Sequence, residues 1–223
     1  MTIGPHVIEA ESYRILAERV DLSGWDPDEA AVLARIIHAS ADVEYARTVR
    51  FTPGAVRAGV EAIRAGGVVI ADVEMTQRGI SSLPARCYLS EVEAGPGGFP
   101  TRSALAMRLA AERHPKGAIV VVGCAPTALD EVIRLHREGS FAPVVVVGLP
   151  VGFVGAAESK LGARQSDLSS ITNQGEKGGS AVAAAAINAM ARLAGRAVEP
   201  VEPVEPVEPV EPVAAPPTTA ERQ

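Results

Sequence analysis

The chain has 223 residues, of which 47% are hydrophobic and 22% charged, a balance typical of an ordinary globular protein of one domain. Residues 199–223 hold six Glu and one Arg and so carry most of the net charge of −6; the remaining residues, with 21 acids and 20 bases, are nearly neutral. A neutral body and an aromatic content of 4% argue against nucleic-acid binding. Two cysteines, Cys87 and Cys124, are too few for a disulfide framework or a four-cysteine zinc site.

The sequence offers no signal for export or for insertion into a membrane. No apolar run approaches the roughly 18 to 20 residues that span a bilayer. Residues 1–10 contain neither the basic nor the apolar segment of a secretion signal. We therefore expect a cytoplasmic protein without membrane contact.

Helical and strand patterns alternate along residues 9–193. Asp26-Pro27 is a typical helix start and Gly66-Gly67 a typical helix end. The predicted helices cover residues 9–20, 28–45, 53–65, 101–113, 126–137 and 180–193. The predicted strands cover residues 68–72, 118–123 and 143–148, with a weaker one over 86–92. Continuously apolar strands are typical of a parallel sheet that is buried on both faces. The pattern predicts a doubly wound α/β fold, mainly parallel and flanked by helices, with ligands at the carboxyl ends of the strands.

The last residues differ from the rest of the chain. Val-Glu-Pro repeats five times from Val198 to Pro212. Proline at every third residue prevents helix and sheet and favours polyproline II. We therefore expect one domain over 1–197 and a disordered tail over 198–223, with a docking segment for a proline-binding partner as the alternative.

Two glycine-rich turns follow predicted strands or precede helices. The first, Gly148 to Gly155, has the spacing G-x3-G-x2-G, which differs from the dinucleotide fingerprint. It is either a tightly packed turn or a backbone anion site with Lys160 near its rim. The second, Gly175 to Ser180, lacks the order of a phosphate-binding P-loop, and Ser180 is either a helix cap or an anion contact.

A third candidate contact lies at the start of a predicted helix. Thr101 is a plausible N-cap, which places Arg102 in the first helical turn. A cation is unfavourable beside the positive end of a helix dipole. We therefore expect Arg102 to have an anionic partner, from the protein or from a ligand.

His38 stands apart from the other three histidines because of its place on a predicted helix. A helical projection puts it opposite the bulky apolar arc of Val32, Leu33, Ile36 and Ile37, among Ala31, Ala34 and Ala41. Such an alanine surface could accept a large flat ligand, and Asp42 is one turn away for an i,i+4 contact. The alternative is a surface histidine with an acidic neighbour. The sequence has no order typical of a Ser-His-Asp triad and no metal-ligand spacing.

Six motifs occur in an order that resembles the precorrin-8X methylmutase family, including its cobalt-precorrin-8 counterparts. The resemblance extends from about Ser12 to about Leu193, and the string from Leu149 to Lys160 is its most specific part. In the family pattern an asparagine stands where this chain has Cys124. The motifs are residues 36–41, 72–75 with Gly79, 101–104, 125–129, 149–160 and 178–180.

The resemblance implies an isomerase of cobalamin biosynthesis. Family members move a methyl group from C11 to C12 of a ring-contracted tetrapyrrole, precorrin-8X, and yield hydrogenobyrinate without a cofactor or metal. The resemblance assigns catalysis to His38 and substrate binding to Ser12 and Arg102, and it implies a homodimer. Thr101, Ser103 and Lys160 lie in the same motifs and complete the expected substrate-binding set.

Two other classes of protein remain as alternatives. One is a nucleotide-dependent enzyme that uses the turn from Gly148 to Gly155. The other is a non-catalytic corrinoid-binding carrier or scaffold. The motifs do not distinguish a metal-free substrate from one that carries cobalt.

Overall fold

A computed structural model describes residues 5–195, with side chains from residue 7 onward. The Val-Glu-Pro tail and the expected domain boundary at 197 therefore lie outside the described residues. The α-helices are α1 (Pro5–Arg19), α2 (Pro27–Ser40), α3 (Tyr45–Thr48), α4 (Ala55–Arg64), α5 (Glu74–Gly79), α6 (Arg102–Arg113), α7 (Pro126–Arg137), α8 (Ala156–Arg164) and α9 (Ser180–Gly195). Short 3-10 turns cover Leu89–Glu91 and Pro96–Gly98.

The strands form one six-stranded sheet in the order β1-β6-β5-β4-β2-β3. All neighbouring pairs are parallel except β1 with β6, which is antiparallel. The strands are β1 (Val49–Phe51), β2 (Val69–Ala71), β3 (Ala85–Cys87), β4 (Ile119–Val122), β5 (Val145–Gly148) and β6 (Ser170–Asn173). The chain runs outward from β2 to β3 and then crosses back to β4, so the carboxyl ends of β2 and β4 flank the switch point of the fold.

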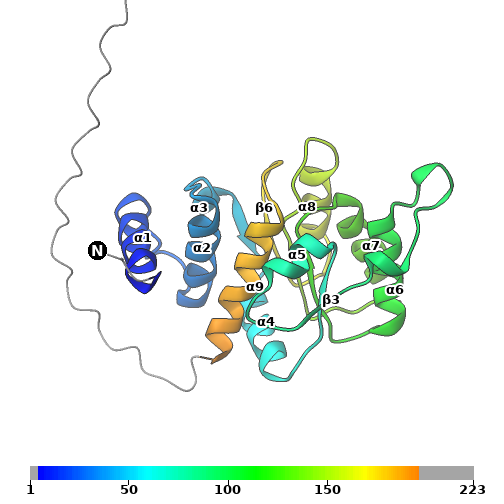
Figure 1. Ribbon diagram of the computed structural model, residues 1–223, viewed down its shortest axis with the longest axis horizontal. Coiled ribbons are helices and arrows are strands. Elements are labelled where there is room, and N and C mark those ends of the chain that lie inside the picture. The colour runs from blue at the N-terminus through cyan, green and yellow to red at the C-terminus, as the bar shows by residue number, and fades with distance from the viewer. Residues whose placement is uncertain (1–4, 196–223) are drawn as a thin grey trace, which may run out of the picture.

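Side chains of each strand point alternately into two apolar layers. In β4, Ile119 and Val121 join one layer and Val120 and Val122 the other. Helices α2, α4 and α9 cover the first layer, and α6, α7 and α8 cover the second. Helix α1 lies outside α2, at the left edge of Figure 1. The predicted doubly wound α/β fold is confirmed.

The predicted helix over 28–45 is wrong at its C-terminal end. Ala41 adopts a left-handed conformation (φ 52°), which ends α2 at Ser40. The carboxylate of Asp42 then accepts the N–H of Glu44 (3.0 Å) just before the short helix α3. The helical spacing from His38 does not reach Asp42, so the expected contact between these two residues does not form.

The sequence analysis did not predict two of the strands, β1 and β6. Strand β6 is the sequence Ser-Ile-Thr-Asn, yet all four residues are buried. Strand β1 pairs with β6 at the edge of the sheet. The weak strand expected over 86–92 ends at Cys87, and a 3-10 turn follows it.

Candidate active site

Asp72 lies at the switch point, directly after β2. Its side chain is fully buried, and its carboxylate accepts the N–H groups of Gly123 (3.1 Å), Cys124 (2.8 Å) and Ala125 (2.8 Å) after β4. These N–H groups precede the first turn of α7, where an anion is favourable. The carboxylate therefore fills the anion site at this end of the sheet and joins the loops after β2 and β4.

His38 contacts helix α1 from the face of α2 that does not carry the buried Val32, Leu33, Ile36 and Ile37. The Ser12 hydroxyl of α1 is 2.8 Å from His38 Nδ1, and the Tyr13 ring lies parallel to the imidazole with centroids 4.9 Å apart. His38 is half-buried, whereas Ile36 and Ile37 are buried in the core. The structure thus confirms that His38 faces away from the apolar arc of α2.

Helix α1 covers the alanine face of α2, which the sequence predicted to be open to a ligand. Ala31 and Ala34 are partly buried, and Tyr13 packs against the same core layer. Nδ1 of His38 is engaged by Ser12, and within residues 7–195 no hydrogen bond reaches Nε2. Nε2 is therefore the ring nitrogen of His38 that keeps hydrogen-bonding capacity in the described chain.

Ion pairs attach α1 to the rest of the fold one turn before Tyr13. Glu9 accepts hydrogen bonds from Arg35 of α2 (2.6 Å) and Arg192 of α9 (3.0 Å). The hydrogen bond from Arg192 is the main reason why the pKa of Glu9 lies below its usual range. Arg35 also donates to the Tyr13 hydroxyl (3.3 Å).

The motif 101–103 begins helix α6 as predicted. Thr101 accepts the N–H of Ala104 and is the N-cap, and its hydroxyl is also 2.7 Å from that of Thr127. Arg102 is exposed and donates to the backbone carbonyls of Leu89 (2.8 Å) and Val92 (3.3 Å). Its partners in the described chain are thus carbonyl dipoles and not the expected anion. Ser103 is half-buried in the first turn of α6.

The two glycine-rich turns pack against each other through their backbones. Gly179 donates to the carbonyl of Leu149 (2.8 Å), and Gly152 donates to that of Glu176 (3.1 Å). A side chain at Gly178 would meet the Leu149 carbonyl at 2.3 Å, so only glycine permits this approach. These N–H groups are used within the protein, which favours tight packing over an anion site. Ser180 bonds to the buried Thr76 hydroxyl (2.9 Å).

Lys160 is fully buried and does not lie at the rim of the turn, as the sequence had suggested. Its Nζ donates to Asn173 Oδ1 (3.0 Å) and to the carbonyl of Lys177 (2.6 Å), beneath the second turn. Burial is the main cause that lowers the pKa of Lys160 to about 8, with a smaller contribution from Arg164. The structure therefore gives Lys160 the position of a support for the turn.

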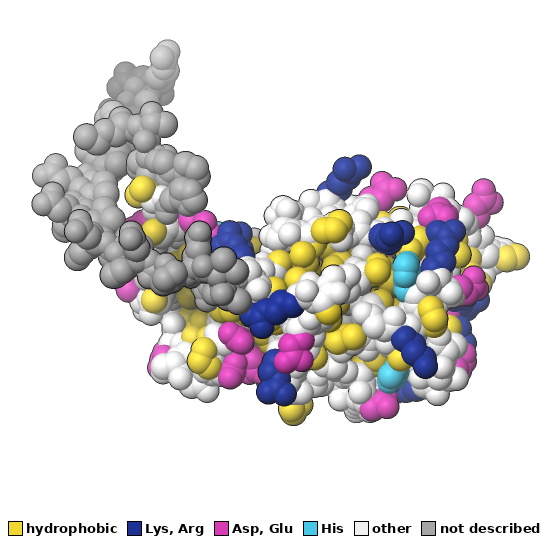
Figure 2. All heavy atoms as spheres, turned by 90° about the horizontal axis from the view of Figure 1, so that it is seen from below, with side chains coloured by type: hydrophobic (Ala, Val, Ile, Leu, Met, Phe, Trp, Pro, Cys, Tyr) yellow, Lys and Arg dark blue, Asp and Glu magenta, His cyan; other side chains and the backbone are white. Residues whose placement is uncertain are grey.

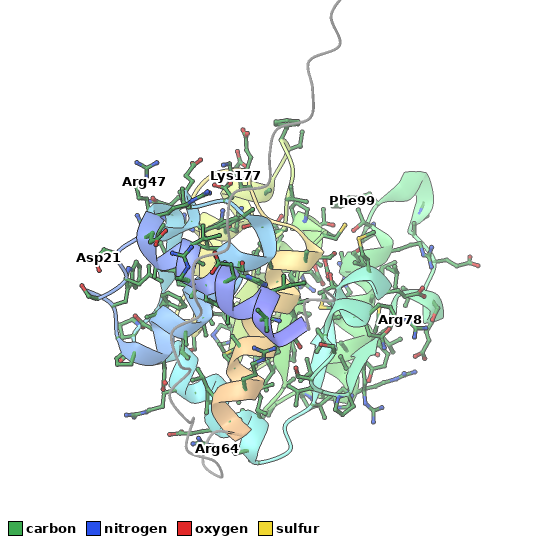
Figure 3. All side chains as sticks on the ribbon, turned by 60° about the vertical axis from the view of Figure 1, so that its left-hand side comes forward. Asp21, Arg47, Arg64, Arg78, Phe99 and Lys177 are labelled. Carbon is green, nitrogen blue, oxygen red and sulfur yellow. The ribbon has the colours of Figure 1, made fainter. Side chains whose placement is uncertain are left out.

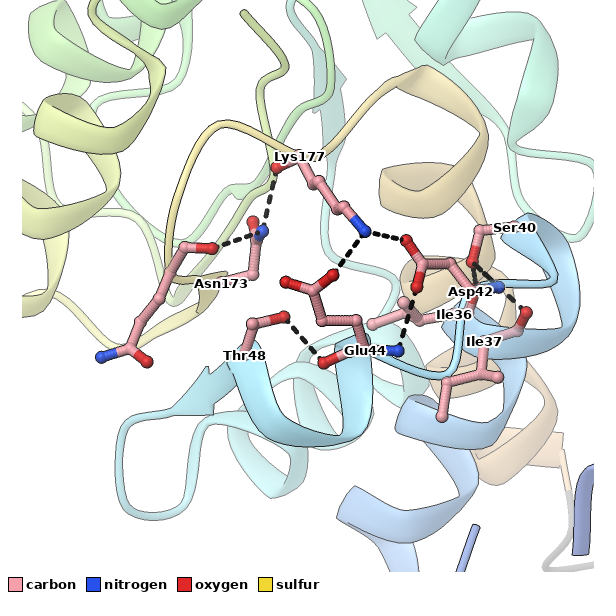
Figure 4. A network of polar contacts seen from close by, with 9 residues as sticks. Ile36, Ile37, Ser40, Asp42, Glu44, Thr48, Asn173 and Lys177 are labelled. Carbon is pink, nitrogen blue, oxygen red and sulfur yellow. Dashed lines mark hydrogen bonds and ion pairs between the residues drawn. The ribbon is translucent and has the colours of Figure 1, made fainter. Parts of the chain in front are cut away.

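Lys177 connects the same turn to the end of the histidine helix (Figure 4). Its Nζ lies 2.5 Å from Asp42 and 2.6 Å from Glu44, both between α2 and α3. The ammonium of Lys177 holds the pKa of Asp42 below its usual range. Figure 3 shows Lys177 beside this region and Phe99 at the same end of the molecule, with Arg64 at the opposite end.

Large apolar side chains are exposed in segments that follow the carboxyl ends of strands. Met75 (71% exposed) follows β2, Phe99 (73%) lies between β3 and α6, and Phe153 (91%) and Val154 (88%) follow β5. Two open hollows, of about 450 and 370 Å³, lie elsewhere, along α7, and neither is lined by His38, Ser12 or Tyr13. On the face shown in Figure 2, acidic and basic side chains are interspersed.

The side chains of residues 7–195 contain no group of three His, Cys, Asp or Glu residues that could hold a metal ion. Over the same part of the chain, no helix is both long and apolar enough to cross a bilayer.

The sequence analysis named Ser12 and His38, which the structure brings into contact, but it did not name their neighbours Glu9 and Tyr13 or the contacts of Lys177. Tyr13 follows Ser12 directly and lies one helical turn after Glu9. Its place beside Ser12 was the one sequence signal that could have drawn attention to it. The stack itself joins residues on two different helices, which no local pattern encodes.

Comparison with known proteins gives a consistent result. A sequence profile described as precorrin-8X methylmutase matches residues 7–193. The chain is 42% identical over 181 residues to the cobalt-precorrin-8 methylmutase of Methanothermobacter thermautotrophicus, covering 79% of this chain and 87% of the relative. It is 38% identical over 188 residues to the precorrin-8X methylmutase of Pseudomonas aeruginosa, covering 79% and 90%. The solved precorrin-8X methyl mutase of Thermus thermophilus superimposes with a TM-score of 0.79 at 36% identity, covering 86% of this chain and 97% of the other.

The doubly wound fold and these relatives place the protein among the isomerases that move a methyl group within one molecule. Within that class, the chain belongs to the precorrin-8X methylmutase family.

Proposed function

We propose that this protein moves a methyl group from C11 to C12 of the ring-contracted tetrapyrrole precorrin-8X and forms hydrogenobyrinate in cobalamin biosynthesis. The observation that carries the proposal is the hydrogen bonding of His38: Nδ1 is bonded to Ser12, and Nε2 has no partner in residues 7–195. The chain around this histidine matches the family over residues 7–193. The substrate and product are isomers, so no atom is gained or lost. The bond from the methyl group to C11 breaks and the bond to C12 forms.

His38 acts in this proposal as the acid. When Ser12 donates to Nδ1, or when the ring is protonated, Nε2 carries a hydrogen. A proton or a strong hydrogen bond given by Nε2 to a nitrogen of the macrocycle would alter the electron distribution of the ring and favour migration. Histidine suits this role because its ordinary pKa lies close to neutral pH.

The remaining substrate-binding residues are proposed from their positions. Arg102 is exposed and uses two of its donors on carbonyls, and a guanidinium has five, so further N–H groups can bind a carboxylate arm. Thr101 and Ser103 lie in the same helix start. Lys160 is buried, so we propose that it acts on the substrate through the turn that it supports.

We also propose that the enzyme is a homodimer. The exposed Met75, Phe99, Phe153 and Val154 provide apolar surface for a second subunit. Sedimentation equilibrium should give twice the monomer mass, and replacement of Phe153 and Val154 by Ser should shift the mass toward that of the monomer.

Cys87 and Cys124 are both free thiols, which fits the reducing cytoplasm proposed as the location of the enzyme.

The decisive experiment is conversion of the precursor by the purified protein. We expect the absorption spectrum to change to that of the product with no change in mass, and parallel reactions with precorrin-8X and cobalt-precorrin-8 identify the physiological substrate. His38→Ala should reduce single-turnover conversion by about 10² to 10⁴-fold while leaving the circular dichroism unchanged. His136→Gln is the matched control, because His136 is bonded to Asp167 and lies on α7, which covers the opposite face of the sheet from α2.

A second candidate function is a corrinoid carrier, and the same experiment separates it. A carrier would bind the tetrapyrrole without converting it, and His38→Ala would then change affinity alone. A folded His38→Ala protein that converts the precursor within a few-fold of the wild type would remove His38 from the acid role.

A further inference from the structure

One face of the His38 imidazole is covered by the phenol ring of Tyr13. The ring centroids are 4.9 Å apart and the planes differ by 10°, which is a parallel stack. Offset stacking of this kind is favourable for aromatic pairs, and the phenol face also attracts an imidazolium cation. The contact is therefore attractive in both protonation states of His38.

The stack and the hydrogen bond restrain different motions of the imidazole. The hydrogen bond between the Ser12 hydroxyl and Nδ1 fixes the direction of one ring atom but lets the ring tilt about the line between the two atoms. The parallel phenol opposes that tilt. Acting together, Ser12 and Tyr13 fix the direction in which Nε2 points.

Tyr13 is itself held in place by its neighbours. Its hydroxyl accepts a hydrogen bond from Arg35 (3.3 Å), and Arg35 also donates to Glu9 (2.6 Å), one turn earlier on α1. The side chains of Arg35 and Glu9 are 22% and 32% exposed, so their ion pair is shielded from solvent more than a surface pair is. Arg192 of α9 donates to the same carboxylate.

We propose that Tyr13 is a positioning residue for methyl migration, which holds the imidazole of His38 at the orientation from which Nε2 meets the macrocycle. The inference rests on the proposed function above. Tyr13 acts through His38 and does not touch the reacting atoms. Proton donation is sensitive to small misplacements of the donor, so loss of the stack should slow the reaction without weakening substrate binding.

The kinetic test compares Tyr13→Leu with Tyr13→Phe. Leucine removes the ring, and we expect kcat to fall by about 3- to 10-fold with KM within about twofold of the wild type. Phenylalanine keeps the ring and loses only the contact with Arg35, which retains Glu9, so kcat should stay within about twofold. Circular dichroism and thermal unfolding confirm that both variants are folded.

A second readout does not depend on turnover. In protein with 15N-labelled histidine and no substrate, the imidazole nitrogens of His38, assigned with His38→Ala, should show one dominant tautomer. Tyr13→Leu should give averaged nitrogen shifts, and Tyr13→Phe should give the wild-type pattern. If the wild type converts neither precursor, the proposed function fails, while the nitrogen shifts still decide whether Tyr13 holds His38.

Three results would overturn the inference. Equal losses in Tyr13→Phe and Tyr13→Leu would assign the effect to the hydroxyl group. A rise in KM alone would mean that Tyr13 contacts the substrate. Unchanged kcat and nitrogen shifts in Tyr13→Leu would mean that Tyr13 has no role.

If Tyr13→Leu does not fold, Glu9→Gln is the second variant, because it weakens the attachment of α1. It should give a smaller fall in kcat and the same averaged nitrogen shifts of His38.

Discussion

Arg102 has protein partners that occupy only part of its hydrogen-bonding capacity. Because a contact with a carboxylate arm stabilises bound substrate and transition state alike, Arg102→Ala should raise KM about 10-fold and leave kcat within about threefold. Steady-state rates over a range of precursor concentrations measure both constants.

Arg57→Ala is the matched control for this arginine, because Arg57 is 83% exposed on α4. It should change neither constant. A fall in kcat for Arg102→Ala at unchanged KM would mean that Arg102 acts on the ring system and not on its arms.

Asp72 has a structural role that can be tested without substrate. Its buried carboxylate accepts three consecutive N–H groups, and an asparagine would present an NH₂ group to some of those donors. Asp72→Asn should therefore lower the free energy of unfolding by about 2–3 kcal/mol. Urea unfolding measures this loss, and the exposed Asp28→Asn should cost much less. Equal losses would contradict the proposed role of Asp72.

Lys160 makes stability depend on pH in a defined range. Its pKa is about 8 in the folded protein and 10.5 in the unfolded chain, so between these values the unfolded state binds more protons. Through this group, the free energy of unfolding should therefore rise as the pH increases from about 8 to 10.5. Below pH 8, the buried ammonium lowers the free energy of unfolding by its full amount. Urea unfolding across this range should show a flatter dependence for Lys160→Met. Parallel curves for the two proteins would refute the assignment.

At the scale of elements, the turn after β6 is held from two directions. Lys160 and Asn173 bind the carbonyl of Lys177 from below, and the side chain of Lys177 reaches the end of α2. Lys177 is about half exposed, so its ion pairs contribute little to global stability. Lys177→Met should speed amide hydrogen exchange in residues 174–179 and change the free energy of unfolding by less than about 1 kcal/mol. Unchanged exchange would show that the contacts of Lys160 and Asn173 hold the turn without the ion pairs of Lys177.

Elements with strong local patterns were predictable from the sequence, and those set by tertiary contacts were not. The apolar runs of β2, β4 and β5 and the cap at Thr101 are local signals, and the structure confirms them. Strand β6 is polar, and its burial depends on its neighbours in the sheet. The end of α2 depends on a left-handed alanine, which no residue preference predicts.

The same distinction between local patterns and tertiary contacts applies to the candidate site. The helical period placed His38 away from the core without any knowledge of its partners. The contact of Tyr13 with His38 and the approach of Lys177 to Asp42 join distant segments, so they require the packed fold.

At the scale of the whole molecule, the family match ends at residue 193, before the Val-Glu-Pro repeat begins. Removal of residues 198–223 should therefore leave folding intact and turnover within about twofold. Thermal unfolding and single-turnover conversion of the shortened chain measure the two properties. An insoluble or inactive product would show that these residues belong to the enzyme.

The ion pair between Glu9 and Arg192 joins residues 183 positions apart, at opposite ends of the described chain. Closing a loop of this length costs chain entropy, and the contact needs both residues to have been synthesised. A ribosome makes Glu9, Ser12 and Tyr13 long before Arg192. During synthesis, His38 therefore lacks part of its surroundings until α9 has been made. A protein truncated before α9 would contain His38 but not Arg192, whose ion pair with Glu9 helps to hold α1 beside it.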